Sequence, residues 1–222
     1  MKTSEHLPVL LEEALAAFDL GADSKVLDGT FGRGGHSGAI LSRLGEQGML
    51  LAMDKDPAAM QVAMGLFSGD ARFHFRQDSF ANMDVFAREL GVHGGLTGVL
   101  LDLGVSSPQL DDASRGFSFK ADGPLDMRMN PGAGESAADW IARVTEADMV
   151  QVFREYGEER FAGRIARAVC ARREESPFVS TSDLADVIRK ANPKWEKHKD
   201  PATRCFQAIR IAVNRELDDV AE

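Results

Sequence analysis

Residues 25–37 read KVLDGTFGRGGHS, and they decide the fold class of this 222-residue chain. A short apolar run ends in the acidic residue Asp28, and four glycines fall within the next seven positions. Apolar residues at helical spacing follow the glycines. A strand, a glycine-rich turn and a helix open a nucleotide-binding βαβ unit, because the chain must turn sharply and let a ligand approach its backbone.

The spacing of these glycines differs from the dinucleotide-binding fingerprint. That fingerprint is G-x-G-x-x-G, whereas here the order is Asp28-Gly-Thr-Phe-Gly-Arg-Gly-Gly. An acid followed by this loop suits a ligand that carries a positive charge and no diphosphate. S-adenosylmethionine, with an ammonium and a sulfonium, is such a ligand. An NAD-type oxidoreductase is a less favoured alternative, and an ordinary structural turn is another.

A second acid closes the next predicted strand. Residues 49–53 form an apolar run that ends in Asp54, about 20 residues after the glycines. A carboxylate at that position accepts hydrogen bonds from ribose hydroxyls. Two acids at neighbouring strand ends therefore favour a cofactor site over unrelated turns.

Two more strands are predicted over residues 72–76 and 96–103. Phe80 follows the first of them, where the adenine of a cofactor would rest, although it equally suits a helix cap. Asp102 falls at the end of the fourth strand, and parallel sheets bind ligands beyond the carboxyl ends of their strands. There it would hold an exocyclic amine against the cofactor's methyl group; the alternative is a carboxylate that caps a turn.

The pattern changes after residue 111. Glycine and proline punctuate the next segment, and no strand pattern is found between residues 112 and 200. Helices are predicted over residues 136–142, 146–156, 159–172 and 182–191, with Thr145 and Ser182 as caps, and a last helix over 203–220. The sequence predicts a Rossmann-like domain of residues 1–111 and about 201–222, interrupted by a helical insertion of about 112–200.

Composition places the chain among soluble globular proteins, with 44% hydrophobic and 27% charged residues. No signal peptide or membrane span is predicted, and the two cysteines lack a metal-binding or disulfide pattern; a reducing cytoplasm fits. The net charge is −9, yet residues 143–215 have a basic excess. Such a segment is either a phosphate-binding face or a set of solvated helix surfaces.

A basic linker over residues 192–201 carries one aromatic residue, Trp195. Charge and stacking of this kind bind RNA. An ordinary surface loop explains the same residues as well.

Several segments, in this order, resemble one family. They are DGTFGRGGHS (28–37), AMDKDP (52–57), LLDLGVSSPQLDDASRGFSF (100–119), DGPLDMRM (122–129), YGEERFA (156–162) and PATRCFQAIRIAVNREL (201–217). Together they resemble the S-adenosylmethionine-dependent methyltransferases that modify the exocyclic N4 amine of a cytosine in 16S ribosomal RNA. The resemblance covers essentially the whole chain.

This resemblance implies an α/β fold of class I methyltransferase type, with a Rossmann-like parallel sheet and an inserted helical domain that recognises RNA. It implies a cytosine of the decoding region as substrate, the small ribosomal subunit as partner, and no metal. The implied cofactor contacts are Gly34, Gly35, His36, Asp54, Phe80, Asp102 and Gln109, with Asp102 as the catalytic residue.

Family chains continue with further strands beyond the point where this chain stops, and only four strands are predicted here. We therefore expect a C-terminally truncated sheet, self-association as a homodimer or weak folding, and impaired transfer activity. A non-catalytic RNA-binding or assembly factor on the same fold stays open as an alternative function.

Overall fold

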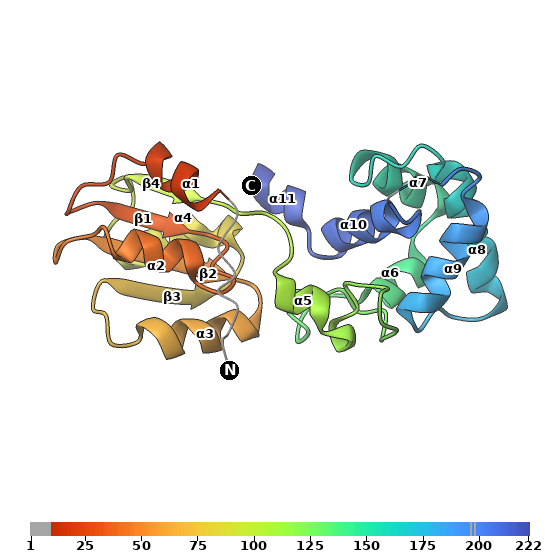
Figure 1. Ribbon diagram of the computed structural model, residues 1–222, viewed down its shortest axis with the longest axis horizontal. Coiled ribbons are helices and arrows are strands. Elements are labelled where there is room, and N and C mark those ends of the chain that lie inside the picture. Colours follow the sequence, from red (N-terminus) through yellow and green to blue (C-terminus); the bar gives the residue numbers. More distant parts are fainter. Residues whose placement is uncertain (1–9, 196, 198) are drawn as a thin grey trace. The chain divides into compact units, whose positions relative to one another are not determined.

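The computed structural model describes residues 10–195, 197 and 199–222. The chain divides into two compact units, one extending to Gly104 together with Glu222, and the other comprising Val105–Ala221. The first holds the parallel sheet and the second is helical (Figure 1). This confirms an α/β fold with a separate helical part. The boundaries differ from those predicted at residues 111 and 201, because the last predicted helix packs in the helical unit.

The sheet unit is built on four parallel strands. They are β1 (Lys25–Asp28), β2 (Met49–Asp54), β3 (Phe73–Gln77) and β4 (Gly98–Leu100), in the order β3-β2-β1-β4 (Figure 1). The central strand β1 places Asp28 beside Ala52 of β2 and Leu100 of β4. The predicted parallel sheet is confirmed, and its carboxyl ends bring the acidic residues to one edge.

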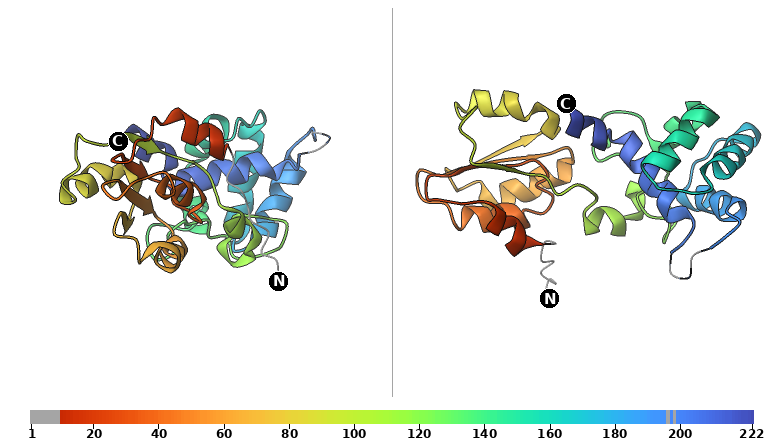
Figure 2. Two further views of the ribbon diagram at one scale, coloured as in Figure 1. Left: turned by 60° about the vertical axis from the view of Figure 1, so that its left-hand side comes forward. Right: turned by 90° about the horizontal axis from the view of Figure 1, so that it is seen from above.

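Helices cover both faces of this sheet. On one side lie α1 (Leu11–Ala17), α2 (Gly35–Leu41) and α3 (Pro57–Phe67), and on the other lies α4 (Met83–Glu89), as the right-hand view of Figure 2 shows. Val26 and Leu50 pack in the first of these layers, whereas Leu27 and Leu51 pack in the second. Successive strand residues thus face opposite layers, which explains why the strands read as unbroken apolar runs.

The helical unit follows the sheet in sequence. Its elements are α5 (Ser107–Asp111), η2 (Ala113–Arg115), α6 (Ala137–Arg143), α7 (Glu146–Glu155), α8 (Ala162–Glu175), α9 (Thr181–Ala191), α10 (Ala202–Val213) and α11 (Glu216–Ala221). One core joins them, including Trp140, Met149, Phe153, Ile165, Leu184, Phe206 and Ile209. Helix α10 packs on α6, α7 and α9, so its apolar stripe belongs to this core and not to the sheet.

Two predicted helix boundaries need correction, whereas the predicted cap Thr145 is confirmed by its side chain, which accepts from the Asp148 N–H. Ser180, not Ser182, caps α9. The Ser182 N–H instead donates to Asp122. The predicted helix over 203–220 is divided into α10 and α11, because Arg215 adopts a positive φ of 52° that no continuous helix contains.

None of the helices in the described residues has the length and apolar character that crossing a membrane requires.

The glycine loop provides a test of this fold. Gly34 caps α2 with a φ of 79°, and an added Cβ would lie 2.8 Å from Cζ of Phe31. Gly34→Ala is expected to destabilise the protein by about 1–3 kcal/mol, from the left-handed backbone and the clash. Gly65→Ala, in the exposed middle of α3 with nothing within 4 Å, should instead stabilise it by about 0.5–1 kcal/mol.

Thermal unfolding of both variants, followed by circular dichroism, measures the difference. Equal melting temperatures for the two variants would contradict the loop conformation described here.

Candidate functional site

The loop between β1 and α2 is organised by a buried carboxylate, Asp28. This residue is fully buried. Its Oδ2 accepts a hydrogen bond from the Ser37 hydroxyl at 2.7 Å, and its Oδ1 accepts one from the Thr30 N–H at 3.1 Å. The second bond is an Asx turn, in which an Asp side chain bonds the backbone two residues on. Asp28 therefore fixes both the start of the turn and the first turn of α2.

Burial changes the acidity of this group. Desolvation raises the pKa of Asp28 to about 6, although the hydrogen bonds from Ser37 and Thr30 and the nearby His36 oppose the shift. The sequence suggested that this acid would face the positive charge of a ligand. Its two oxygens instead bind the protein's own loop, so its role here is to shape the site.

Asp54 grips the same loop from the neighbouring strand. Its Oδ2 accepts from the Gly32 N–H at 2.7 Å, and its Oδ1 accepts from the Asp56 N–H at 2.8 Å. Burial raises the pKa of Asp54, and these backbone hydrogen bonds partly offset the shift. The carboxylate is only partly buried. Each oxygen retains a second lone pair with which to accept from a ligand hydroxyl.

Asp102 differs from the other two acids because its side chain is 58% exposed. It lies just beyond β4, and its N–H donates to the Thr30 hydroxyl at 2.7 Å. Its Oδ2 lies 3.9 Å from Nδ1 of His36, a residue that is 8% exposed in the first turn of α2. Thr30 thus holds the backbone of Asp102 against the glycine loop while the carboxylate stays accessible.

Phe80 lies on the other side of this strand edge. It begins η1 (Phe80–Asn82) and is buried, with 6% exposure. A Cβ added to Gly29 would lie 2.8 Å from Cβ of Phe80 and 2.5 Å from Cδ2 of Leu101. Only glycine therefore allows β1 to leave the sheet between these side chains.

The predicted site residues are divided between the two units. Gly34, Gly35, His36, Asp54, Phe80 and Asp102 all lie in the sheet unit, at the carboxyl ends of the strands or in the segments that follow them. Gln109 lies in α5 of the helical unit, where it is buried and its side-chain oxygen accepts from the Ser106 N–H at 2.8 Å. That bond is half of a capping box at the start of α5.

Sequence reasoning missed two residues that shape the site, Thr30 and Ser37. Thr30 links Asp28 to Asp102, because its N–H bonds the first and its hydroxyl accepts from the second. The Asp-x-Thr spacing of an Asx turn was a signal for the first contact. The second contact joins residues 72 positions apart, and nothing local in the sequence announces it.

These residues fit an adenosyl cofactor by the chemistry of their groups. Asp54 offers acceptors for hydroxyls, and Asp102 offers an exposed negative charge close to the loop. The glycine loop begins at the central strand β1, next to the point where the strand order reverses, which is where open parallel sheets bind their ligands. The fold and this site define a Rossmann-like α/β protein of the methyltransferase type.

A sequence model of the MraW methylase family matches residues 3–222, and the chain belongs to that family. It is 61% identical over 215 residues to the "Ribosomal RNA small subunit methyltransferase H" of Chromohalobacter salexigens. The aligned region covers 97% of this chain and 64% of that protein. The chain thus spans just under two thirds of the length of the relative that it matches.

The buried acid makes the stability of the protein depend on pH. The folded state raises the pKa of Asp28 from 3.8 to about 6, so ionisation opposes folding and stability falls as the pH rises through this window. Asp28→Asn removes the titrating group. The variant should therefore gain stability relative to the wild type by roughly 3 kcal/mol between the two ends of this window, and no more at higher pH.

Urea unfolding at a series of pH values measures this difference, with Asp23→Asn as control because Asp23 is exposed on the approach to the same strand. A constant difference between Asp28→Asn and the wild type at every pH would contradict the assignment.

Proposed function

We propose that this chain transfers a methyl group from S-adenosylmethionine to the exocyclic N4 amine of a cytosine in the decoding region of 16S ribosomal RNA. The observation that carries the proposal is the exposed carboxylate of Asp102, fixed by Thr30 beside the glycine loop. Family membership and the name of the Chromohalobacter relative support ribosomal RNA of the small subunit as the substrate.

The cofactor would be held by residues that already shape the loop. Asp54 would accept hydrogen bonds from the ribose hydroxyls through its remaining lone pairs. Gly34, Gly35 and His36 begin α2, and their backbone would approach the ligand closely because two of them lack a side chain. Phe80 would form an apolar wall near the adenine, and Gln109 completes the proposed set of contacts.

Asp102 would act on the substrate amine. S-adenosylmethionine, when bound, supplies a methyl group that its sulfonium has already activated, so no metal and no strong base are required. A carboxylate at this place would accept a hydrogen bond from the amine, orient its lone pair and accommodate the positive charge that develops on nitrogen. Water is a sufficient acceptor for the proton that the amine then loses.

The helical unit would recognise the RNA. It carries the basic residues 143–215, within a chain whose net charge is −9. Its own core makes it a compact body independent of the sheet, as a recognition domain requires. The small ribosomal subunit would be the partner, and the cytoplasm, where that subunit is assembled and modified, would be the location.

Two carboxylate variants separate binding from catalysis. Asp54→Ala should weaken S-adenosylmethionine binding by about tenfold or more, since it removes charged hydrogen bonds. Asp102→Asn should lower methyl transfer at least about a hundredfold while calorimetry still detects the cofactor. Radiolabel transfer to small ribosomal subunits, with mass mapping of the product nucleoside, measures the reaction, and Asp84→Asn, on the exposed surface of α4, is the control.

Calorimetry with NAD in place of S-adenosylmethionine should show no binding. A wild-type chain that binds RNA and the cofactor but forms no methylated cytidine would be a non-catalytic factor, contrary to the proposal.

Self-association is the remaining part of the proposal. Strand β4 is an edge strand, and Val99 and Leu103 at this edge are exposed. Such an edge is a template for pairing with a second copy. Light scattering should show a dimer that Val99→Lys, a charge on the edge strand, converts to monomer. A wild type that is monomeric at every concentration would contradict this part.

A further inference from the structure

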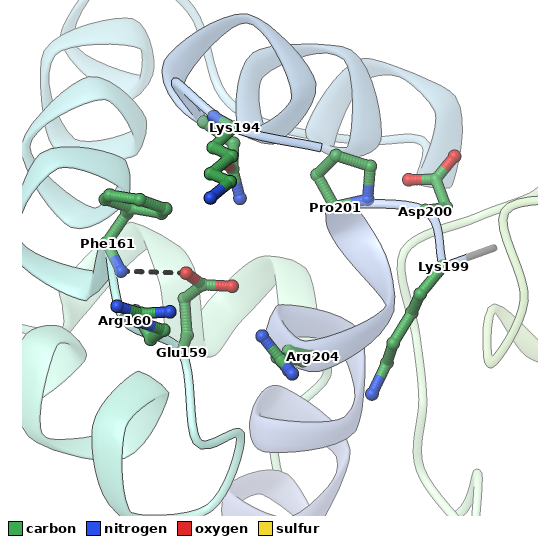
Figure 3. A pocket seen from close by; sticks show the side chains of 9 residues that line it. Glu159, Arg160, Phe161, Lys194, Lys199, Asp200, Pro201 and Arg204 are labelled. Atoms are coloured by element: carbon green, nitrogen blue, oxygen red, sulfur yellow. Dashed lines mark hydrogen bonds between the residues drawn. The ribbon is translucent and has the colours of Figure 1, made fainter. Parts of the chain in front are cut away.

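The helical unit contains a cavity of about 300 Å³ that the proposed chemistry does not use. Three segments meet around it: residues 159–161 before α8, the linker that follows α9, and the start of α10 (Figure 3). Its lining comprises Glu159, Arg160, Phe161, Asn192, Lys194, Lys199, Asp200, Pro201 and Arg204. Two of these segments, YGEERFA and PATRCFQAIR, are motifs of the sequence that the methyl-transfer site leaves without a role.

Positive charge dominates the lining. Arg160, Lys194, Lys199 and Arg204 come from all three segments, and Figure 3 shows their side chains spread around the cavity. Within the described part of the chain, no ion pair joins Arg160, Lys194 or Lys199 to a carboxylate. These cations outnumber the two acids of the lining, so the cavity has an excess of positive charge.

Both acids are engaged in building the walls. Glu159 is 3% exposed, and its Oε1 accepts from the Phe161 N–H at 2.8 Å, where α8 begins. Asp200 accepts from the Ala202 N–H at 2.9 Å, where α10 begins, and it pairs with Arg189 at 2.9 Å. The carboxylates thus fix the backbone of the cavity, and the charge of Asp200 is balanced by an arginine outside the lining.

Two helices point their amino-terminal ends at this place. Helix α8 starts after Phe161 and α10 starts after Pro201, and neither of these cap residues supplies a side-chain hydrogen bond to its helix. The amino end of a helix carries a partial positive charge. Helix ends and cationic side chains therefore act together, and an anionic group is the ligand that this cavity suits.

Aromatic rings distinguish RNA from other anionic ligands. Phe161 is a half-buried part of the lining, and Trp195, adjacent to Lys194, is 59% exposed. Bases of single-stranded nucleic acid stack on exposed aromatic side chains while basic groups follow the phosphates. An acidic peptide has no base for these rings to stack on.

We propose that this cavity binds a backbone phosphate of single-stranded RNA, with the neighbouring base stacked on Trp195 or Phe161. The phosphate site follows from the cavity itself, whereas RNA as the source of the phosphate rests on the proposed function. The cavity acts as an anchor for the substrate strand and takes no part in the chemistry of transfer.

Fluorescence anisotropy with a labelled single-stranded RNA oligonucleotide tests this on the full chain. Arg160→Gln combined with Lys194→Gln should weaken binding about tenfold or more, and should lower the slope of log affinity against log salt by about two, one for each cation removed from the phosphate. The matched control combines Arg167→Gln with Lys120→Gln, which removes the same charge from exposed positions outside the lining.

Trp195→Ala should weaken binding with no change in that slope, because stacking releases no counterions. Inorganic phosphate should compete only at far higher concentration than RNA, whereas competition at equal concentration would identify a free phosphate as the ligand and overturn the assignment to RNA.

Equal reductions of affinity in the cavity variant and its control would show a general charge effect and overturn the proposal. Cofactor calorimetry on the same samples keeps the two proposals apart. A cavity variant with unchanged RNA affinity defeats this inference alone, whereas a wild type that binds RNA through the cavity but fails to bind S-adenosylmethionine defeats the proposed methyl transfer alone.

Discussion

The site depends on one buried carboxylate at the end of the central strand. Asp28 is shielded from water, and both of its oxygens accept hydrogen bonds from the loop that follows it. A buried acid is costly unless it is satisfied in this way, so the loop has one conformation in which Thr30 and Ser37 face Asp28. That conformation also points the Thr30 hydroxyl at the backbone of Asp102. The position of the proposed catalytic carboxylate is therefore set from beneath the site.

Three acids at neighbouring strand ends have thus acquired different roles from their surroundings. Burial gives Asp28 a structural role, and partial burial lets Asp54 hold the Gly32 amide while keeping acceptors for a ligand. Exposure leaves Asp102 able to meet a substrate. The helical unit repeats this division, because the buried Glu159 shapes a cavity whose charge comes from arginines and lysines of its lining.

The strands, their parallel order and the acids at their ends could be predicted from the sequence, because apolar runs ending in an acid are local signals. The role of Asp28 was not predictable in this way, since a short motif does not show whether its carboxylate faces a ligand or the protein. The membership of α10 was missed because an apolar stripe does not say which core it packs on. Ser182 was mistaken for a cap because Ser180, two residues earlier, suits the position equally well.

The central claim is that Asp28, Asp54 and Asp102 organise one binding site for S-adenosylmethionine at the carboxyl edge of the sheet. A crystal structure of the chain with S-adenosylmethionine tests it most directly. The account predicts ribose hydroxyls at Asp54, the methyl group directed toward Asp102, and Asp28 still bonded to Thr30 and Ser37 beneath the ligand. A cofactor bound away from these strand ends, or an Asp28 that has left its loop to contact the ligand, would contradict it.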